Sequence, residues 1–491
     1  MHSPFSTRRD FLSNSSLGLG TVALSWMLHQ DALRAEGAAP RTGVPSPGTA
    51  PLRGHASALK PHFAPKAKRI VQIFACGGVS HIETFDHKPD LEKLHGKSLE
   101  GKGENKGFFG QPGKIMKSVF PFGQHGQCGA WVSDLLPNIA GCVDDLCFIH
   151  SMTNKNNNHT PATFFMNTGS TLNGYPSMGA WLSYGLGTEN ENLPTFVVLP
   201  DAVGHPAGGS INWTAGFLPA SHQGVAFRTQ PGSEPIVDLE TPKDVSPASR
   251  EAAMNFLKRQ NTRYAEGNPG DTALTARIRS YELAARMQAT VPEAADLDSE
   301  PAALREAYGL NDKRSEAFGR NCLLARRLLE RGTRFVQIFN GGAFGSPRIN
   351  WDAHEDMREN HTKMAATMDK PVAALIKDLK QRGMLEDTLF VWCTEFGRGP
   401  ATQGIDKPGR DHHPDGFTVF LAGAGVKKGF RYGSTDEVGY FASENPVTVY
   451  DFHATILHLL GLNHEKLTFY FNGINRRLTD VHGHVVKDIL A

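Results

Sequence analysis

The sequence predicts an α/β fold in which a mostly parallel, doubly wound sheet carries helices on both faces. Three observations lead to this prediction. Short apolar runs typical of buried strands recur along the chain, helical stretches separate them, and glycine or polar turns follow several runs. Strands that alternate with helices are typical of parallel sheets. At 491 residues the chain exceeds the usual size of one core, so we expect one large domain with embellishments.

Short apolar runs account for the predicted strands. The first covers residues 69–75, and Gly77 and Gly78 follow it, as expected of a strand that feeds a tight turn. The other predicted strands share its short length and lie at residues 144–150, 193–200, 333–339, 387–393 and 416–423.

Longer stretches have helical patterns. Residues 246–331 are charged and rich in Ala and Leu, with a break near residues 291–300, which predicts a helical insertion. The strongest amphipathic pattern covers residues 363–383 and places these residues on one face: Met364, Met368, Val372, Leu375, Ile376 and Leu379. Shorter helices are predicted at residues 160–167, where Gly169 ends the helix, and at residues 451–462.

The N-terminus carries an export signature. Arg8 and Arg9 form a twin-arginine motif, a weakly apolar stretch follows at residues 17–24, and residues 32–35 offer a small-residue cleavage site. The alternative is an accidental arginine pair before a short helix. We expect export to the periplasm or the extracellular space. The predicted parts are a signal peptide at residues 1–35, a flexible leader at 36–65 and the folded domain at 66–491.

The charge and hydropathy of the chain limit the kinds of partner that we expect. The formal net charge is +1, and no basic stripe is interleaved with aromatic residues, so nucleic acid is not an expected partner. No run of about 18 uncharged apolar residues occurs, so we expect no integral membrane segment in the mature form.

The six cysteines form no C-x-x-C pair, which disfavours a zinc ribbon or a dithiol redox site. An oxidising destination permits disulfides, and Cys128, Cys142 and Cys147 are the closest in sequence, but their pairing does not follow from sequence. Cys76 and Cys393 lie at predicted strands, where a cysteine acts as a small buried hydrophobe.

Three short runs gather carboxylates and imidazoles after predicted strands. Asp352 and His354 lie in the first run, Glu395 in the second, and Asp411 and His412 in the third. Strand ends of α/β sheets are where ligands and metals bind. Oxygen and imidazole donors are those that Mg, Ca, Mn or Zn select, so the sequence predicts a divalent metal site of unknown metal identity.

The chain resembles the bacterial family catalogued as domain of unknown function 1501, whose members are exported by the twin-arginine pathway and are grouped with the alkaline phosphatase and sulfatase superfamily. The resemblance covers nearly the whole chain and rests on motifs at residues 77–89, 324–332, 351–354, 395–398 and 409–412. It implies an alkaline phosphatase-like fold and hydrolysis of a phosphate or sulfate ester, so the implied partner is a small anionic or polymeric ester substrate.

The resemblance also implies metal ligands. The superfamily's first acidic position corresponds to Glu83 or Asp86, and the rest of the implied set is Asp352, His354, Glu395, Asp411 and His412. His413 is implied to be a packing substitute beside His412. The superfamily commonly has a histidine where this chain has Phe396, so a complete two-metal site is in doubt. For each carboxylate the alternative is a helix cap or an Asx turn.

The implied nucleophile position falls on His159, with Thr160 beside it, about ten residues before Thr168 and Gly169. Thr160 can act as a metal-activated alkoxide, and His159 as a ligand, a base or a phosphoryl acceptor. The alternative makes Thr160 only the N-cap of the helix, with Pro161 at its first position. No cysteine stands in a C-x-P-x-R motif, which excludes formylglycine chemistry.

Arg398 and Arg410 are candidate catalytic residues because a planar guanidinium grips phosphate, sulfate or carboxylate at two points. Alternatively, Arg410 pairs with Asp411 or a neighbouring acid. We expect an exported metal-dependent hydrolase-like protein that acts on an anionic ester. A non-catalytic metal- or ligand-binding scaffold that has lost the nucleophile is the second expectation.

Overall fold

A computed structural model describes residues 60–99, 113–236, 239, 245–268, 271–343, 349–403 and 408–491. The predicted signal peptide at residues 1–35 and the leader up to residue 59 lie outside these ranges. The last leader residues already contact the fold, since the backbone N–H of His62 donates to the carbonyl of Gly461 at 2.8 Å.

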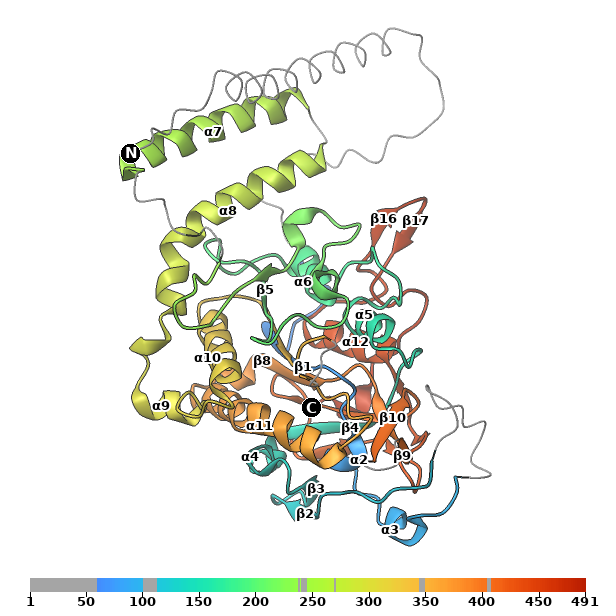
Figure 1. Ribbon diagram of the computed structural model, residues 1–491. Coiled ribbons are helices and arrows are strands. Elements are labelled where there is room, and N and C mark those ends of the chain that lie inside the picture. Colours follow the sequence, from blue (N-terminus) through green and yellow to red (C-terminus); the bar gives the residue numbers. More distant parts are fainter. Residues whose placement is uncertain are drawn as a thin grey trace, which may run out of the picture. The chain divides into compact units, whose positions relative to one another are not determined.

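The centre of the fold is a nine-stranded sheet (Figure 1). Its neighbours are parallel except at β11, which runs antiparallel to both β4 and β8, so the predicted α/β class with a mostly parallel sheet is confirmed. In spatial order the strands are β12 (Phe430–Tyr432), β4 (Leu146–Thr153), β11 (Phe417–Ala422), β8 (Thr388–Cys393), β1 (Arg69–Ala75), β7 (Phe335–Asn340), β5 (Phe196–Leu199) and β6 (Val225–Ala226), with β15 (Val447–Thr448) paired to β4.

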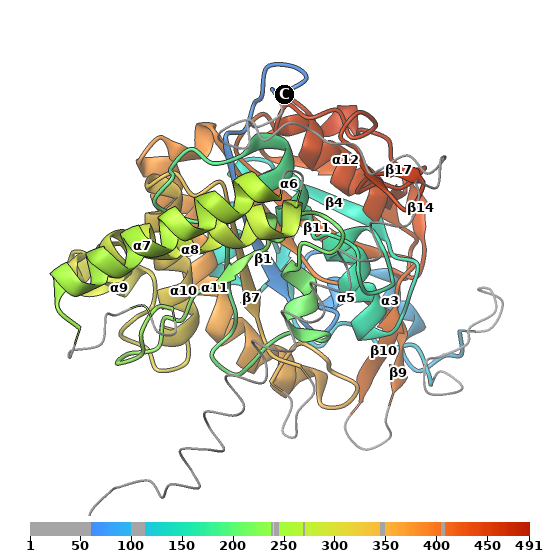
Figure 2. The ribbon, with the colours of Figure 1, turned by 90° about the horizontal axis from the view of Figure 1, so that it is seen from above.

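Helices cover both faces of this sheet (Figure 2). Because successive strand residues point to opposite faces, Val71 and Ile73 of β1 enter one core and Ile70 and Phe74 enter the other. The first core is covered by α4 (Pro137–Ala140), α8 (Thr272–Ala295), α10 (Glu316–Glu330) and α11 (Met357–Gln381), and the second by α5 (His159–Thr168), α6 (Met178–Leu186) and α12 (Val449–Leu459).

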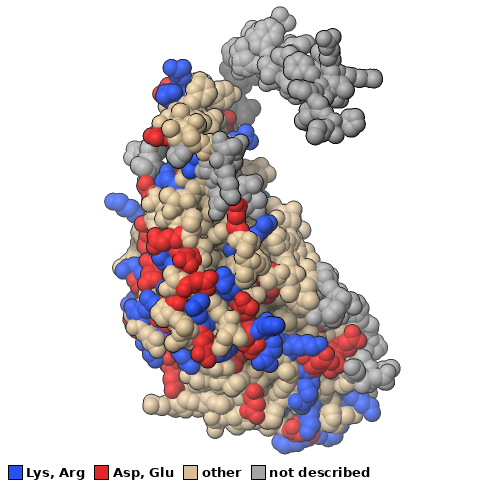
Figure 3. Space-filling view, turned by 60° about the vertical axis from the view of Figure 1, so that its left-hand side comes forward, with Lys and Arg blue, Asp and Glu red and all other residues tan. Residues whose placement is uncertain are grey.

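The predicted helical insertion contains α7 (Pro247–Gly267), α8 and α9 (Ala302–Ala307) before α10. Several large apolar side chains of α7 are exposed, among them Phe256, Leu257 and Tyr264. On the face that Figure 3 shows, acidic and basic side chains lie interspersed, which agrees with a formal net charge of only +1. Among the described residues, no helix is both long and apolar enough to span a membrane.

Outside the large sheet, short helices and two-stranded ribbons complete the fold. One ribbon was not predicted: β9 (Gly397–Gln403) pairs antiparallel with β10 (Gly409–His413), where the sequence suggested loops. The other ribbons are β2 (Phe122–His125) with β3 (Ala130–Ser133), β13 (Ser434–Thr435) with β14 (Ala442–Glu444), and β16 (Phe469–Phe471) with β17 (Ile474–Arg476); the short helices are α2 (His81–Thr84) and α3 (Asp90–Leu94).

Element boundaries differ from the prediction by a few residues at most ends. The largest shift is at α11, which begins at Met357 because Asp356 adopts a left-handed conformation with φ of 50° just before it. The helix α5 ends as predicted, since Gly169 has φ of 68° and caps it. All six cysteines are free thiols, and Cys76 and Cys393 are buried.

Candidate metal centre

Three strand ends and the β9–β10 ribbon bring the candidate residues together. The strands β1, β8 and β4 run in the same direction, because β11 is antiparallel to both β8 and β4. Their carboxyl ends therefore share one edge of the sheet, which is the usual ligand-binding edge of α/β folds. The loop after β7, the start of α5 and the ribbon reach the same edge, as the contacts below show.

Four side chains form what we call the His–Asp cluster: His159, Asp352, His354 and His412. One ligand atom from each lies within 4.8 Å of all the others, and every residue is buried, with exposures of 3% to 8%. His159 is the first residue of α5, His412 lies on β10, and Asp352 and His354 follow β7. The chain thus gathers three imidazoles and a carboxylate from three separate segments.

The ligand atoms of the His–Asp cluster are spaced as metal ligands are. Asp352 Oδ1 lies 3.2 Å from His159 Nε2, 2.9 Å from His354 Nε2 and 3.1 Å from His412 Nε2. The Nε2 atoms of His354 and His412 are 2.8 Å apart. Ligands bonded to one tetrahedral zinc ion at about 2.0–2.1 Å lie about 3.3 Å from one another. The observed spacings are slightly shorter than this value.

The outer nitrogen of each imidazole faces an oxygen acceptor. His159 Nδ1 lies 2.6 Å from a carboxylate oxygen of Glu395, and His412 Nδ1 lies 2.7 Å from the carbonyl oxygen of Asn157. His354 Nδ1 faces the amide oxygen of Gln403. Each neutral ring therefore carries its proton on Nδ1 and directs its Nε2 lone pair inward, as metal-binding histidines do. The donor set fits a divalent metal.

In the protein without metal, burial and neighbouring charges shift the pKa values of three cluster residues in different ways. Burial, followed by the positive charge of Arg398, lowers the pKa of His412 to about 2, so this ring is neutral at neutral pH. The pKa of Asp352 is lowered, because Arg398 and the histidine hydrogen bonds outweigh the opposing effect of burial. Burial acts to lower the pKa of His159, but its hydrogen bonds to Asp352 and Glu395 outweigh burial and raise the pKa, so a metal ion that binds at Nε2 must displace a proton there.

Arg398 holds Asp352 in place. Its guanidinium is fully buried and donates to Asp352 Oδ1, to the carbonyl oxygens of Gly78 at 2.8 Å and Arg410 at 3.0 Å, and to that of Gly77. These partners occupy the planar fork. The structure therefore gives Arg398 a supporting contact within the protein, and its predicted grip on a substrate anion stays a prediction.

Gly77 allows the loop that carries Asp352 to approach the end of β1. Its φ is 113°, and an added Cβ would lie 2.6 Å from the backbone nitrogen of Asp352. The backbone N–H of Trp351 donates to the carbonyl of Cys76 at 2.8 Å. The backbone N–H of Gly77 itself donates to Glu395 Oε1 at 2.8 Å. Only a residue without a Cβ allows the backbone of Trp351 and Asp352 to come this close to Gly77.

Glu395 lies beside the His–Asp cluster and is not one of its four members. Its Oε1 accepts from His159 Nδ1 and from Gly77, and its Oε2 accepts from Thr394 Oγ1 at 3.2 Å. These contacts orient His159, which the resemblance had placed at the nucleophile position, and a ligand role of Glu395 itself stays a prediction.

Glu83 and Asp86 have other partners and do not join the cluster. Glu83 is fully buried and forms an ion pair of 2.7 Å with Arg410, whose guanidinium is also fully buried. Asp86 pairs with Lys88 at 3.0 Å and accepts from Thr435 Oγ1. The structure thus shows the alternative for Arg410, pairing with an acid, and an anion-binding role of Arg410 stays a prediction.

The remaining candidates flank the cluster. Asn158, not Thr160, is the N-cap of α5, since its side chain accepts from the backbone N–H of Thr160. Asp411 lies 3.8 Å from His354 Nδ1 and accepts from the backbone N–H of His412 at 2.8 Å. His413 stacks on Tyr440 with ring centres 4.2 Å apart, which agrees with a packing role.

Sequence reasoning did not find Asn157 and Gln403, the acceptors for His412 and His354. A backbone carbonyl has no sequence signal, and Gln403 lies in none of the motifs. Phe396 was noticed only as a departure from the resemblance. Its buried ring packs against His159 and His412, with ring centres 4.9 Å and 4.7 Å away, and so forms an apolar wall of the cluster.

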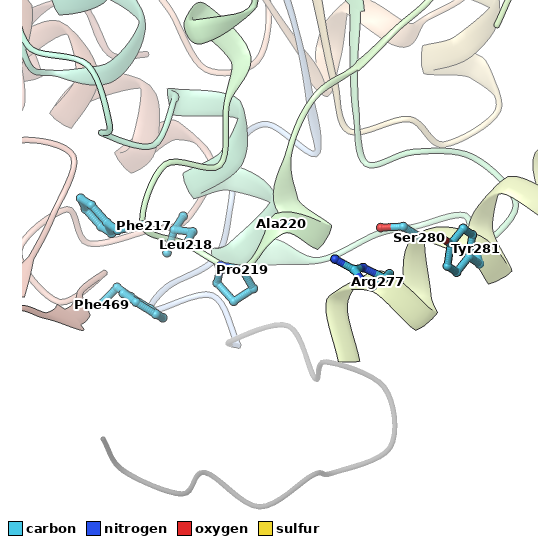
Figure 4. A pocket seen from close by; sticks show the side chains of 8 residues that line it. All are labelled: Phe217, Leu218, Pro219, Ala220, Arg277, Ser280, Tyr281 and Phe469. Carbon is cyan, nitrogen blue, oxygen red and sulfur yellow. The ribbon is translucent and has the colours of Figure 1, made fainter. Parts of the chain in front are cut away.

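A separate cavity of about 550 Å³ lies between α8 and the β16–β17 ribbon (Figure 4). Phe217 and Phe469 form one wall, and Arg277 and Tyr281 of α8 form the other. Its lining residues are all different from those of the His–Asp cluster.

Comparison with known proteins identifies the family. The family described as "Protein of unknown function (DUF1501)" matches residues 67–490, so this chain belongs to that family. The motifs at residues 77–89, 351–354, 395–398 and 409–412 all fall within this span. No curated protein matches the sequence.

Solved structures resemble the chain at low identity. PsFucS1 sulfatase from Pseudoalteromonas sp. is 12% identical with a TM-score of 0.35, over 87% of this chain and 72% of that one. A protein in the alkaline phosphatase superfamily from Vibrio parahaemolyticus is 10% identical with a TM-score of 0.35, over 83% and 70%. A TAB5 alkaline phosphatase mutant with bound Mg is 10% identical with a TM-score of 0.33, over 82% and 99%. Likenesses at this level assign no activity to the chain.

Proposed function

We propose that this member of the DUF1501 family is a metal-dependent hydrolase-like protein that acts on an anionic phosphate or sulfate ester. The observation that carries the proposal is the His–Asp cluster, in which three Nε2 lone pairs and one carboxylate converge while three oxygen acceptors hold the outer nitrogens. The ester class rests on the family resemblance of the motifs.

The donor atoms indicate which of the expected metals the site prefers. Imidazole nitrogen suits borderline cations such as Zn²⁺ and, less strongly, Mn²⁺, whereas Mg²⁺ and Ca²⁺ prefer sites built only from oxygen. Three of the four donors here are imidazoles. Among the expected metals, Zn²⁺ is therefore the preferred occupant and Mn²⁺ the next, held by His159, Asp352, His354 and His412.

Charge supports an anionic substrate. With the three imidazoles neutral, as metal ligands must be, Asp352 and Glu395 contribute two negative charges and Arg398 one positive charge, so these groups carry a net charge of −1. A divalent cation changes this to +1, which favours an anion. Such a cation supplies Lewis-acid polarisation of an ester oxygen when it is bound.

The residues around the cluster have defined tasks. Arg398 keeps Asp352 ionised, and Glu395 holds the Nδ1 proton of His159 so that its Nε2 serves as a ligand. Phe396 excludes water from one side of the rings. With His159 used as a ligand, Thr160 is the hydroxyl nearest to it in the chain, and we assign any covalent route to Thr160.

A second candidate is a metal-binding scaffold without catalytic activity. It is favoured by one observation: the guanidiniums of both predicted anion-binding residues, Arg398 and Arg410, are fully buried and engaged with protein acceptors. A hydrolase of anionic esters needs another group to orient its substrate, and the scaffold does not.

The experiment is an ester-hydrolysis assay with the exported protein reconstituted with Zn²⁺, Mn²⁺, Mg²⁺ or Ca²⁺. Aryl phosphate, aryl phosphodiester and aryl sulfate serve as substrates, with Thr160→Ala and Asp352→Asn as variants. We expect turnover that requires Zn²⁺ or Mn²⁺, is lost in Asp352→Asn and falls in Thr160→Ala. Tight metal binding without turnover of any ester would contradict the hydrolase proposal and support the non-catalytic scaffold.

We also propose export by the twin-arginine pathway to the periplasm or beyond, on the evidence of Arg8, Arg9 and the apolar stretch at residues 17–24. Fractionation of cells that express the full chain tests this proposal. Replacement of both arginines by lysine should retain the protein inside the cytoplasm, and unchanged export would contradict it.

A further inference from the structure

The β9–β10 ribbon supplies several side chains to the His–Asp cluster. Arg398 of β9 lies directly opposite His412 of β10 in the antiparallel pairing, and Gln403, at the end of β9, lies opposite Gly409. The two paired strands thus contribute a candidate ligand, the guanidinium that holds Asp352, and a side-chain amide.

The loop that carries Asp352 and His354 docks on this ribbon. The carbonyl of Ala353 accepts from the backbone N–H of Arg410 at 2.9 Å. A Cβ added at Gly409 would lie 2.2 Å from the carbonyl carbon of His354, so the two backbones touch. This contact places the ring of His354 against Gln403, whose Oε1 faces His354 Nδ1.

We infer that Gln403 is a positioning residue of the metal centre, which accepts the Nδ1 proton of His354 and so fixes the inward direction of its Nε2 lone pair. This inference rests on the proposed metal site. Glu395 and the carbonyl of Asn157 do the same for His159 and His412. Of these three acceptors, Glu395 is charged and that of Asn157 belongs to the backbone. Only the Gln403 acceptor can therefore be removed by a side-chain substitution that leaves the charge unchanged.

The inference predicts a graded response of metal affinity. Gln403→Leu keeps a similar volume but loses the acceptor, and loss of such an outer contact typically weakens metal binding by about 10- to 100-fold. Gln403→Glu keeps an acceptor and should bind Zn²⁺ at least as tightly as wild type. Gln381→Leu, at the exposed last residue of α11, is the matched control and should not change affinity.

The measurement is competition for Zn²⁺ against a chromogenic chelator, with thermal unfolding as a check on folding. Wild-type Zn²⁺ binding together with unchanged affinity in Gln403→Leu would overturn the inference and leave the metal site intact. Failure of wild type itself to bind Zn²⁺ or Mn²⁺ would overturn the metal site, and the inference with it.

A second measurement does not need the metal. In zinc-free protein with ¹⁵N-labelled histidine, the ring signals of His354, assigned by their loss in His354→Gln, should report a proton on Nδ1. Gln403→Leu should shift these signals toward a mixture of tautomers, and Gln403→Glu should restore them. Identical His354 signals in all three proteins would overturn the inference, even if Gln403→Leu binds Zn²⁺ weakly for another reason.

Discussion

The Nε2 atoms of His354 and His412 lie 2.8 Å apart, while the Nδ1 atom of each ring faces an oxygen acceptor. Two neutral rings held in this way point lone pairs at each other, which is unfavourable unless a proton or a cation lies between them. Burial and Arg398 lower the pKa of His412 to about 2, which disfavours a proton on that ring. A cation held by both Nε2 atoms and by Asp352 Oδ1, which lies 2.9 Å and 3.1 Å from them, would remove this repulsion.

The buried pair of Glu83 and Arg410 should contribute to the stability of the fold. Arg410→Met leaves the Glu83 carboxylate buried without its partner, which typically costs about 3–5 kcal/mol of unfolding free energy. Denaturant unfolding tests this, and the double variant with Glu83→Gln should recover part of the loss. A single variant as stable as wild type would show that the pair is not a structural requirement.

Gly77→Ala should disturb the metal centre through the backbone. The new Cβ would lie 2.6 Å from Asp352 N and 2.7 Å from Trp351 N, so the loop must move. Gly383→Ala is the matched control, because its φ of 70° is also left-handed but its Cβ would meet no atom within 4 Å. We expect Gly77→Ala to lose both stability and Zn²⁺ affinity and Gly383→Ala to lose only about 1 kcal/mol of stability. Equal effects of the two substitutions would contradict the close approach.

The unfolding free energy should decrease as the pH is lowered, because His361 is buried in its neutral form. Burial, then the charges of Arg398 and Arg410, lowers its pKa from 6.5 to about 3. At a pH between these two pKa values, His361 is protonated in the unfolded chain and neutral in the folded chain. The unfolding free energy contributed by this ring is therefore present above pH 6.5 and is lost as pH falls, by up to ~1.4 kcal/mol per pH unit.

The measurement for His361 is denaturant unfolding between pH 7 and pH 4.5 with a metal chelator present. His361→Gln retains an acceptor for the backbone N–H of Ser80 but cannot take up the proton. Its stability should decline less steeply with falling pH than that of wild type. Parallel curves for the two proteins would show that His361 titrates alike in both states.

The central strands could be predicted closely because both of their faces are buried. The predicted runs 69–75, 387–393 and 416–423 match β1, β8 and β11 to within one residue at each end. Strands covered on both faces read as continuous apolar runs. The β9–β10 ribbon has no such run, and long-range contacts such as that between Arg410 and Glu83 stabilise it, so its sequence did not predict strands.

The candidate site could be predicted as a set of residues but not as a set of contacts. All four members of the His–Asp cluster were among the predicted site residues. The sequence could not separate them from Glu83, Asp86 and Glu395, because a carboxylate that binds a metal and one that pairs with an arginine or orients a histidine look the same. The difference depends on long-range partners, Arg410 for Glu83, Thr435 for Asp86 and His159 for Glu395, which lie 327, 349 and 236 residues away in sequence.

Metal content tests the central claim most directly. Protein matured by export, and protein dialysed against Zn²⁺ or Mn²⁺, would be assayed by elemental analysis and calorimetry alongside His412→Ala and His413→Ala. We expect one divalent cation per chain in wild type and in His413→Ala, and its loss in His412→Ala, because only His412 reaches Asp352. Wild type without bound cation, or loss of the cation in His413→Ala but not in His412→Ala, would contradict the account.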